Sequence, residues 1–174
     1  MREGMIYATI AKVPKGAMVL KYLLVFLISM VPVVELRGAI PIALGMGIDF
    51  WTALVICVIG NILPVPVIYI FARKFLTWGA DKRYIGKVCT FFLVKGEKAG
   101  QKLVKATGRG GLFLALMLFV GIPLPGTGAW TGTLGASFLD MGFKSTAVSV
   151  ALGVILAGVI MAVGTTGVFS IFGM

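Results

Sequence analysis

The chain has 174 residues, of which 59% are hydrophobic and 13% charged, and its mean hydropathy is +1.06. A soluble domain of this length has about 25% charged residues, and one core could not bury so much apolar surface. The composition excludes a soluble domain and predicts an integral membrane protein. The chain has no histidine, which removes the commonest metal ligand and the usual general base at neutral pH. We expect no catalytic site, no metal site and no cofactor, and we predict that the protein is not an enzyme.

Residues 1–16 lack the apolar run and the small-residue cleavage site of a signal peptide. A short interfacial helix is expected over residues 5–13. Hydropathy then divides the chain into four apolar blocks, at residues 18–48, 51–72, 111–139 and 145–172. A spanning helix needs about 20 apolar residues. The second and fourth blocks are therefore predicted to be ordinary transmembrane helices.

The first and third blocks are each interrupted in the middle. In the first block, PVVELRGAIP places the helix breakers Pro32 and Pro41 on either side of Glu35 and Arg37. In the third block, GIPLPGTGAWTGTLG (residues 121–135) contains two prolines and five glycines. Both interruptions predict a break in the helix at membrane depth.

The two interrupted blocks also resemble each other. A Gly-Ala pair, a Leu-Gly pair and an aspartate follow one another in both, with an offset of 90 residues between the Gly-Ala pairs (Gly38-Ala39, Leu44-Gly45 and Asp49; Gly128-Ala129, Leu134-Gly135 and Asp140). Each half then closes with an apolar helix. We predict an all-α integral membrane protein with a single membrane domain, residues 1–174. It comprises two pseudo-symmetric repeats, 18–77 and 110–174, joined by a basic cytoplasmic loop, 78–109.

The net charge of +10 is concentrated around this loop. Between residues 73 and 109 only Asp81 and Glu97 oppose the cations Arg73, Lys74, Lys82, Arg83, Lys87, Lys95, Lys98, Lys102, Lys105 and Arg109. Such a stretch can bind nucleic acid, but it lies between membrane segments. A loop against anionic headgroups is therefore favoured, and no nucleic-acid partner is expected. Residues 71–84 are typical of an interfacial helix with snorkelling cations. Cys57 and Cys89 form no CxxC motif and are predicted to be inert thiols.

Two topologies fit the interrupted blocks. In the first, each block is a re-entrant hairpin, so a single crossing separates two inverted repeats whose tips meet near the midplane. In the second, the blocks are kinked spans and the repeats are parallel. The N-terminal segment is as basic as the central loop, and the positive-inside rule would place both inside, which only the second topology allows. We prefer hairpins because the prolines and the Glu-Arg pair make residues 18–48 a poor continuous span. Both topologies remain open.

Glu35 is the only carboxylate embedded in a hydrophobic block. A carboxylate or guanidinium at mid-bilayer costs about 2.5–3.5 kcal/mol even on lenient insertion scales, so such groups face a cavity or a partner. Glu35 is a candidate proton or cation site, and Arg37 suits carboxylate or phosphate recognition. The alternative is a static ion pair that fixes the hairpin tip. That pair requires a turned or extended backbone, because residues two apart on a helix do not face each other.

The second interruption carries no charge. It offers threonine hydroxyls, the Trp130 indole N–H and backbone groups freed by glycines, which can face an anion or a cation. It is not a P-loop, because the Lys-Ser/Thr pair is missing. The alternative is a packed, kinked helix with small residues at its contacts. Asn61, a polar residue inside the second block, completes the candidate proton, ion or substrate-binding residues: Pro32, Glu35, Arg37, Gly38, Pro41, Asn61, Pro123, Pro125, Gly126, Thr127, Gly128, Trp130 and Thr131.

ELRGAIP, a central basic loop and PLPGTGAWTG together resemble the small multidrug export protein family of bacteria and archaea, over nearly the whole chain. That family looks like a relative of the DedA/VTT membrane proteins. The resemblance implies two facing re-entrant hairpins and proton-coupled transport, with lipid carriers such as undecaprenyl phosphate moved by DedA-like relatives. It matches Glu35 and Arg37 to the first hairpin and Pro123–Trp130 to the second. DedA proteins typically carry an arginine in or near the second hairpin, whereas the nearest downstream cation here is Lys144.

We therefore predict a multi-pass transporter in the plasma membrane of a prokaryote. It would export or translocate an amphipathic substrate or a lipid-carrier phosphate, with proton or ion coupling, and its partners would be that substrate and membrane lipids. The alternatives are a lipid scramblase without ion coupling, a structural or scaffold membrane protein, and a membrane enzyme that acts on lipids. Two hairpins and two spans enclose little volume, so a homodimer is compatible with the sequence, which specifies no interface, substrate or coupling ion.

Overall fold

The structure, a computed structural model, describes residues 15–32, 34–82, 85–124 and 126–171. Its helices are α2 (Lys15–Met30), α3 (Glu35–Gly45), α4 (Phe50–Ile62), α5 (Val65–Ala80), α6 (Gly86–Gly121), α7 (Ala129–Phe138) and α8 (Phe143–Ile171). No strand occurs in the described part of the chain. The all-helical prediction is therefore confirmed, whereas the helix expected over residues 5–13 lies outside the described residues.

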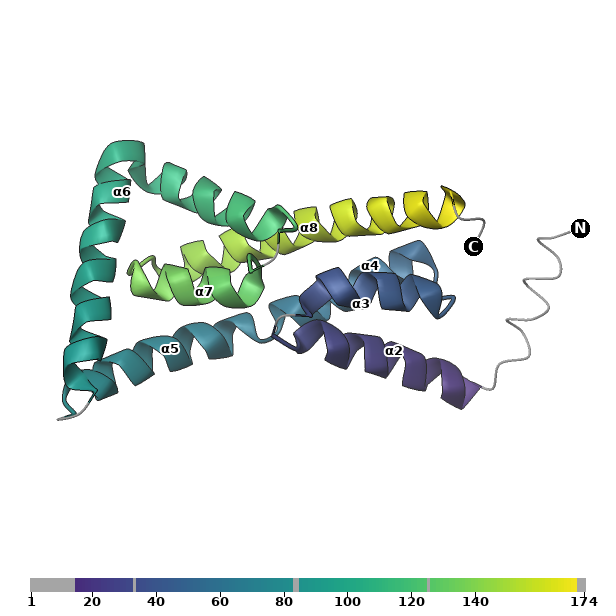
Figure 1. The fold of residues 1–174 in the computed structure, drawn as a ribbon, viewed down its shortest axis with the longest axis horizontal. Coiled ribbons are helices and arrows are strands. Elements are labelled where there is room, and N and C mark those ends of the chain that lie inside the picture. The colour runs from purple at the N-terminus through teal and green to yellow at the C-terminus, as the bar shows by residue number, and fades with distance from the viewer. Residues whose placement is uncertain (1–14, 33, 83–84, 125, 172–174) are drawn as a thin grey trace, which may run out of the picture.

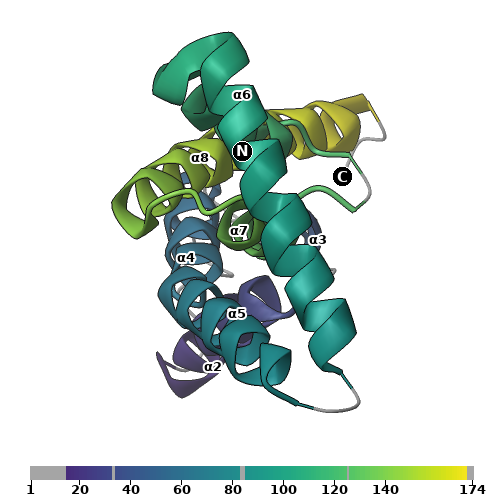
Figure 2. The same cartoon turned by 90° about the vertical axis from the view of Figure 1, so that its left-hand side faces the viewer.

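Most of the helices lie along one long axis (Figure 1). α2 runs to the middle of the molecule, and α3 turns back beside it toward the end where α2 begins. α4 and α5 then run to the opposite end, where α6 starts across the axis and bends (Figures 1 and 2). The remainder of α6 returns to the middle, α7 turns back beside it, and α8 runs along the axis again.

Gly108 divides α6 into a first limb, residues 86–107, and a second limb, residues 109–121. Its backbone (φ 70°, ψ 173°) is open to glycine and costly for other residues. The first limb corrects the prediction of a loop over residues 78–109, because the chain is helical from Gly86 on. Lysine, leucine, glutamate and glutamine favour helix, and Gln101 donates to the Glu97 carboxylate one turn earlier (3.3 Å).

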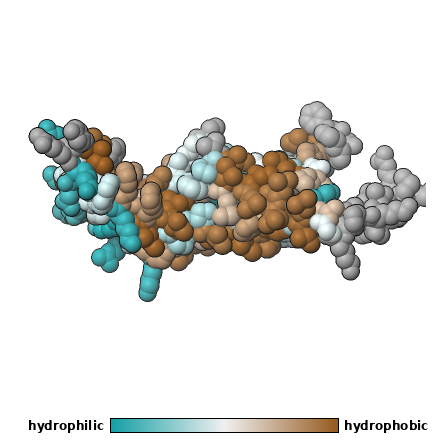
Figure 3. Space-filling view, turned by 90° about the horizontal axis from the view of Figure 1, so that it is seen from below, coloured by the Kyte–Doolittle hydropathy of each residue, from teal (hydrophilic) through white to brown (hydrophobic). Residues whose placement is uncertain are grey.

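Three helical segments of the described chain are long and apolar enough to cross a membrane: Phe50–Ala80, Gly86–Gly121 and Phe143–Ile171. The space-filling view shows hydrophobic surface over the middle of the molecule and hydrophilic surface at the end where the first limb of α6 lies (Figure 3). The chain is thus a multi-pass membrane protein, as its composition predicts.

The first of these segments joins α4 and α5. Leu63 and Pro64 between the two helices keep right-handed helical backbone angles, so the prolines there do not end the span. α5 continues to Ala80. Residues 71–80 therefore extend the span, which corrects the separate interfacial helix predicted over residues 71–84.

The break in the first interrupted block is shorter than the two prolines predict. Residues 31, 32 and 34 lie in a turn or bend, α3 begins at Glu35, and Pro41 lies inside α3. A proline in a helix removes one backbone hydrogen bond. The helix continues because its other face is fully packed, with side chains that are at most 1% exposed on both sides of the proline (Leu36, Ala39, Ile40 and Ala43).

The turns that follow α3 and α7 share one hydrogen-bond pattern. In each, two backbone N–H groups bond carbonyls four and five residues earlier at 2.9–3.0 Å (Met46 to Ile42 and Ile48 to Ala43; Leu139 to Gly135 and Met141 to Ala136). Between these donors lies a residue with positive φ, Gly47 (77°) or Asp140 (55°). The next helices begin at Phe50 and Phe143.

The backbone of these turns therefore recurs with an offset of 93 residues, the separation of Phe50 and Phe143. The offset of 90 would pair Gly38, inside α3, with Gly128, which precedes α7. The longer offset pairs Gly60 with Gly153, and both lie against a helix backbone. A methyl group added at Gly60 would lie 2.8 Å from the Phe26 oxygen, and one at Gly153 would lie 2.6 Å from the Met117 oxygen. Such close approach of backbones is typical of helix packing in membranes.

Two further features fix the ends of the helices. Gly96 and Gly100 lie on the first limb of α6, and a Cβ at either would overlap the backbone oxygen of Phe138 or Leu139, so this limb packs directly on the end of α7.

At the other end of the molecule Asp49 caps α4 by accepting a hydrogen bond from the Thr52 N–H (2.9 Å). The hydrogen bonds from Thr52 lower the pKa of the Asp49 carboxyl.

Candidate functional site

The two interruptions predicted from the sequence meet in the middle of the molecule. The turn between α2 and α3, residues 31–34, faces the segment between α6 and α7, residues 122–128 (Figure 1). We refer to α2 with α3 as the first hairpin, and to the second limb of α6 with α7 as the second hairpin. Both charged residues lie on the first turn of α3, and both side chains contact the second hairpin.

Glu35 caps a helix that is not its own. Its Oε1 accepts a hydrogen bond from the backbone N–H of Trp130 (3.2 Å), in the first turn of α7, and the N–H of Ala129 also interacts with the carboxylate. The first N–H groups of a helix have no partner within it, and the helix dipole favours a negative charge there. Glu35 is 5% exposed and has a left-handed backbone (φ 49°). Such strain at a buried charged residue is typical of functional sites.

Gly128 leaves the space that the Glu35 carboxylate occupies. A Cβ at position 128 would overlap both carboxylate oxygens. The backbone of Gly128 is extended (φ 162°), which other residues adopt readily. Glycine is therefore required at position 128 by the lack of space and not by backbone conformation.

Arg37 binds the opposite end of the second hairpin's turn. Its guanidinium donates to the backbone oxygens of Val120 (3.3 Å), Ile122 (3.2 Å) and Leu124 (2.6 Å), and to Thr127 Oγ1 (2.8 Å). The Thr127 hydroxyl donates in turn to the Ile122 or Leu124 oxygen, each 2.9 Å away. Carbonyls at a helix C-terminus lack partners within the helix and carry partial negative charge. The forked guanidinium can satisfy several of them at once.

Trp130 completes the link between the hairpins in the other direction. Its indole Nε1–H donates to the Met30 oxygen at the end of α2 (3.1 Å). Each hairpin thus supplies a side chain that satisfies helix ends in the other. The direct ion pair considered between Glu35 and Arg37 is not present: of the described residues, only Arg73 and Asp140 form an ion pair. Glu35 binds the N-terminus of α7, whereas Arg37 binds the C-terminal end of α6 and the turn that follows it, so the two side chains point in different directions.

A cavity of about 440 Å³ opens beside these contacts. Eight of the residues predicted from the sequence line it: Pro32, Glu35, Arg37, Pro123, Gly126, Thr127, Trp130 and Thr131. Leu124, Leu134 and Met161 complete the lining. The sequence does not single out these three, because apolar residues carry no signal inside apolar blocks.

The other candidate residues do not line this cavity. Gly128 lies against the Glu35 carboxylate. Gly38 and Pro41 lie within α3. Asn61 is 1% exposed in α4, and neither atom of its amide has a hydrogen-bond partner among the described residues. Asn61 does not line the cavity at the hairpin tips. Pro125 lies outside the described residues.

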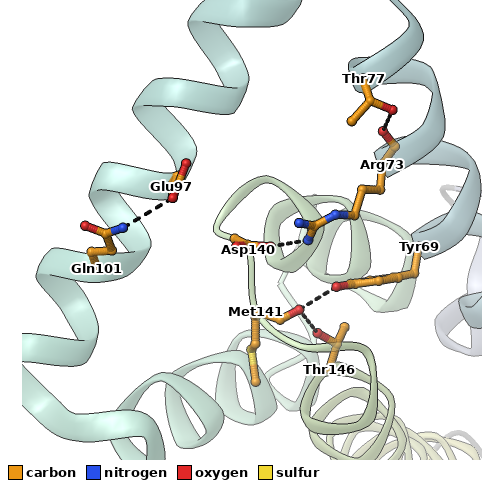
Figure 4. A network of polar contacts seen from close by, with 8 residues as sticks. All are labelled: Tyr69, Arg73, Thr77, Glu97, Gln101, Asp140, Met141 and Thr146. Atoms are coloured by element: carbon orange, nitrogen blue, oxygen red, sulfur yellow. Dashed lines mark hydrogen bonds and ion pairs between the residues drawn. The ribbon is translucent and has the colours of Figure 1, made fainter.

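A second polar cluster, which the sequence does not predict, holds α5 to the turn after α7 (Figure 4). The Tyr69 hydroxyl (2.7 Å) and the Thr146 hydroxyl (3.2 Å) both donate to the Met141 oxygen, and Arg73 pairs with Asp140. Two of these bonds end on a backbone oxygen, which leaves no pattern in the sequence. The ion pair is about half exposed, so it contributes little to stability.

The three candidate spans, with the buried Glu35 and the half-buried Arg37 between two hairpin turns, define a polytopic helical membrane protein. The model of the family described as "putative small multi-drug export protein" matches residues 35–160, more than two thirds of the 174 residues. The chain therefore belongs to the small multi-drug export protein family, and the match begins at Glu35. No curated protein and no solved structure matches the chain.

Proposed function

We propose that this protein is a proton- or ion-coupled transporter whose two hairpins are re-entrant from opposite sides of the membrane. The observation that carries the proposal is the placement of Glu35 and Arg37. Both are charged residues of the first hairpin, both bind the turn of the second, and both line the cavity where the hairpins meet. An ionisable residue at membrane depth is a functional candidate by default.

Helix lengths support the re-entrant topology. α2 has 16 residues, α3 has 11 and α7 has 10, which correspond to about 24, 17 and 15 Å at 1.5 Å per residue. The second limb of α6, residues 109–121, reaches about 20 Å on the same scale. None of these lengths crosses a hydrocarbon core of about 30 Å. The 31 residues of Phe50–Ala80 and the 29 residues of α8 do. The Gly86–Gly121 candidate does not act as one rod, because Gly108 bends it.

The order of elements makes the two repeats inverted. One crossing, Phe50–Ala80, separates the first hairpin from the second. The shared turn pattern at an offset of 93 residues supports a common ancestry of the halves. Inverted repeats in transporters place the binding site at their interface near the midplane, which is where the hairpin turns meet.

The charge distribution then orients the chain. The first limb of α6 carries five of the ten cations of the basic stretch, so the positive-inside rule favours a cytoplasmic position for it. α2 begins at the opposite end of the molecule (Figure 1), so Lys15 and Lys21 lie on the outer side. Lys21 is engaged there, because its Nζ donates to the Met46 oxygen at the end of α3 (3.0 Å). This contact gives Lys21 a structural role that is independent of the positive-inside rule.

Three neighbouring cavities along the second hairpin support an amphipathic substrate. The first, of about 570 Å³, lies between α6 and the 139–142 turn and includes two cations and two carboxylates (Lys105, Arg109, Glu97 and Asp140). The second, of about 260 Å³, is a mostly apolar groove between the second limb of α6 and α7. Leu112, Leu139 and Met141 line both. Thr131 lines the groove and also the cavity at the hairpin tips. Polar, apolar and charged surfaces thus follow one another from the cytoplasmic end to the middle.

Proton coupling follows from the role of Glu35 as a cap. The charged carboxylate binds the N-terminus of α7 and holds the tips together. Protonation removes that charge and weakens the contact, so the hairpins can separate and the substrate can pass. Arg37 stays charged and can exchange the carbonyls of the second hairpin for an anionic group of the substrate. A lipid-carrier phosphate is one such substrate. Arg37 would then supply, from the first hairpin, the arginine that DedA-like proteins carry near the second.

Transport in proteoliposomes tests this proposal directly. Two probes separate the substrate classes: ethidium, an amphipathic cation, and phosphatidic acid with a fluorescent label, a lipid phosphate. With a pH gradient imposed, we expect one probe to cross faster than in empty liposomes, and a dye inside the liposomes to report accompanying proton movement. Equal rates with and without protein, for both probes and over a range of gradients, would contradict the proposed function.

Cysteine accessibility tests the topology separately. In a background where Cys57 and Cys89 are replaced, single cysteines at positions 16, 49, 90 and 140 are labelled in intact cells with an impermeant maleimide. We expect labelling at 16 and 49, on the outer side, and protection at 90 and 140 until the membrane is permeabilised. Positions 16 and 49 lie at the start of α2 and just before α4, whereas positions 90 and 140 lie in the first turns of α6 and just after α7, toward the opposite end of the molecule (Figure 1). If 16 and 90 report the same side, the re-entrant topology is wrong.

A further inference from the structure

The corner between α5 and α6 holds a cavity that the transport site does not use. It measures about 730 Å³, and four of the residues that line it are lysines: Lys82, Lys87, Lys95 and Lys98. None of the described residues that line it is a carboxylate. The two acidic residues nearby in the sequence are Asp81, which ends α5, and Glu97, which accepts a hydrogen bond from Gln101 and lines a different cavity. The cavity is therefore strongly cationic.

Two of the lysines are held at the boundary between polar and apolar surface. Lys82 Nζ lies 4.7 Å from the centroid of the Trp78 ring, and Lys95 Nζ lies 5.3 Å from that of Phe91. A cation over an aromatic face is attracted by the ring electrons. Tryptophan and snorkelling lysine are both typical of the headgroup level of a membrane. These contacts are the ones expected of ammonium groups at the depth where lipid phosphates lie.

The first limb of α6 has an apolar face that other described residues leave exposed. Val88, Phe91 and Val94 are 56%, 54% and 44% exposed, and they recur every three residues along the helix. The limb lies across the ends of the long helices (Figures 1 and 2), where hydrophobic surface gives way to hydrophilic surface (Figure 3). Lys87, Lys95 and Lys98 lie on this same side of the helix and line one cavity with Phe91 and Val94. A helix side that presents ammonium groups beside apolar side chains, in this position, matches the headgroup level of a bilayer.

We propose that this cavity binds the phosphate headgroup of an anionic phospholipid in the bilayer that surrounds the protein. Lys87, Lys95 and Lys98 supply the charge, the Thr90 hydroxyl is available as a donor, and Phe91 and Val94 contact the upper part of the acyl chains. Lysine binds phosphate as a point charge and accepts varied headgroup orientations. The bound lipid fixes the first limb of α6 against the membrane. This inference does not depend on the transport proposal.

The test measures lipid binding to the purified full-length protein in a neutral detergent. Phosphatidylglycerol and phosphatidylcholine are titrated, and retained lipid is counted by native mass spectrometry alongside the thermal midpoint. We expect phosphatidylglycerol to bind and to raise the midpoint, and phosphatidylcholine to do neither. The triple variant K87Q/K95Q/K98Q is expected to bind phosphatidylglycerol about tenfold more weakly or worse, since each lysine near an anionic surface contributes substantially.

The matched control is K74Q/K102Q/K144Q. These three lysines are exposed and line none of the four cavities described above, yet their loss changes the net charge equally. It should keep wild-type binding. Equal losses in both triple variants would show diffuse attraction without a site and overturn the proposal. An equal midpoint shift with inorganic phosphate would identify a free anion as the ligand and also overturn it. If K87Q/K95Q/K98Q does not fold, the single variant K95Q is expected to show a weaker form of the same loss, and wild-type binding by K95Q would contradict the site.

Discussion

A Glu35→Gln variant is expected to fold and to lose coupled transport by about tenfold or more. Glutamine has nearly the same shape, and its amide oxygen can still accept the hydrogen bond from the Trp130 N–H. The exchange replaces a charged acceptor by a neutral one, which costs about 1–2 kcal/mol of folding free energy. It also removes the protonation step, so the contact between the hairpin tips no longer responds to the pH gradient. Proton flux and probe movement are measured in the same proteoliposomes, and the unfolding midpoint is measured in detergent.

Asp49→Asn is the matched control for this change. Asp49 is also a carboxylate that caps a helix, but it lies at the end of the molecule and outside the hairpin tips. Asparagine caps helices as well as aspartate does, so stability and transport should both remain near wild type. Full proton-coupled transport by the Glu35→Gln protein, with the control behaving as expected, would remove Glu35 from the coupling mechanism.

The positions of the charged residues could be predicted from the sequence, whereas their partners could not. Glu35 stands out because it is a carboxylate within an apolar block, and Arg37 stands out with it. Their partners lie 95 and 83–90 residues away, and most are backbone groups of apolar residues. Every residue has a backbone oxygen, so residue type does not indicate which of them accepts a hydrogen bond. From the sequence alone, the nearest charged partner that could be suggested for each residue was the other member of the pair.

The helices, too, could be predicted from the sequence only in part. Hydropathy located the apolar blocks, because burial in lipid demands continuous apolar sequence. It missed the first limb of α6, where Gly96, Gly100 and several lysines are typical of a loop. That limb is helical in a place where its two glycines lie against the backbone oxygens of Phe138 and Leu139. At Pro41 the sequence predicted a helix break where the structure has a helix. Tertiary packing around α3 outweighs the one hydrogen bond that a proline removes.

Loss of the Arg37 side chain is expected to have the largest effect on stability. Arg37→Met keeps a long apolar stem but leaves the backbone oxygens of Val120, Ile122 and Leu124 without this donor. Each unsatisfied buried acceptor costs about 1–3 kcal/mol, and solvent reaches part of this cluster, so we expect a total loss of about 3 kcal/mol. Arg37→Lys keeps the charge but cannot reach all four acceptors at once, and an intermediate loss is expected. Thermal unfolding in detergent measures both.

Arg73→Met is the control, since it removes a guanidinium from the half-exposed ion pair with Asp140. That change should cost at most about 1 kcal/mol. A similar cost for Arg37→Met would mean that its four hydrogen bonds do not hold the hairpins together.

A double-mutant cycle of Arg37→Met with Thr127→Val separates the contact between the two hairpins from the simple loss of the Arg37 charge. Arg37 and Thr127 are joined by a hydrogen bond of 2.8 Å, so the two changes should couple by about 1 kcal/mol or more.

The double variant Glu35→Leu with Arg37→Met provides the decisive comparison with a scaffold role. A scaffold needs only a stable contact between the tips, which well-packed apolar side chains can supply. A transporter needs a contact that can open. A double variant that recovers stability but does not transport would therefore assign the two charges to the opening of the site, whereas recovery of both would contradict that role.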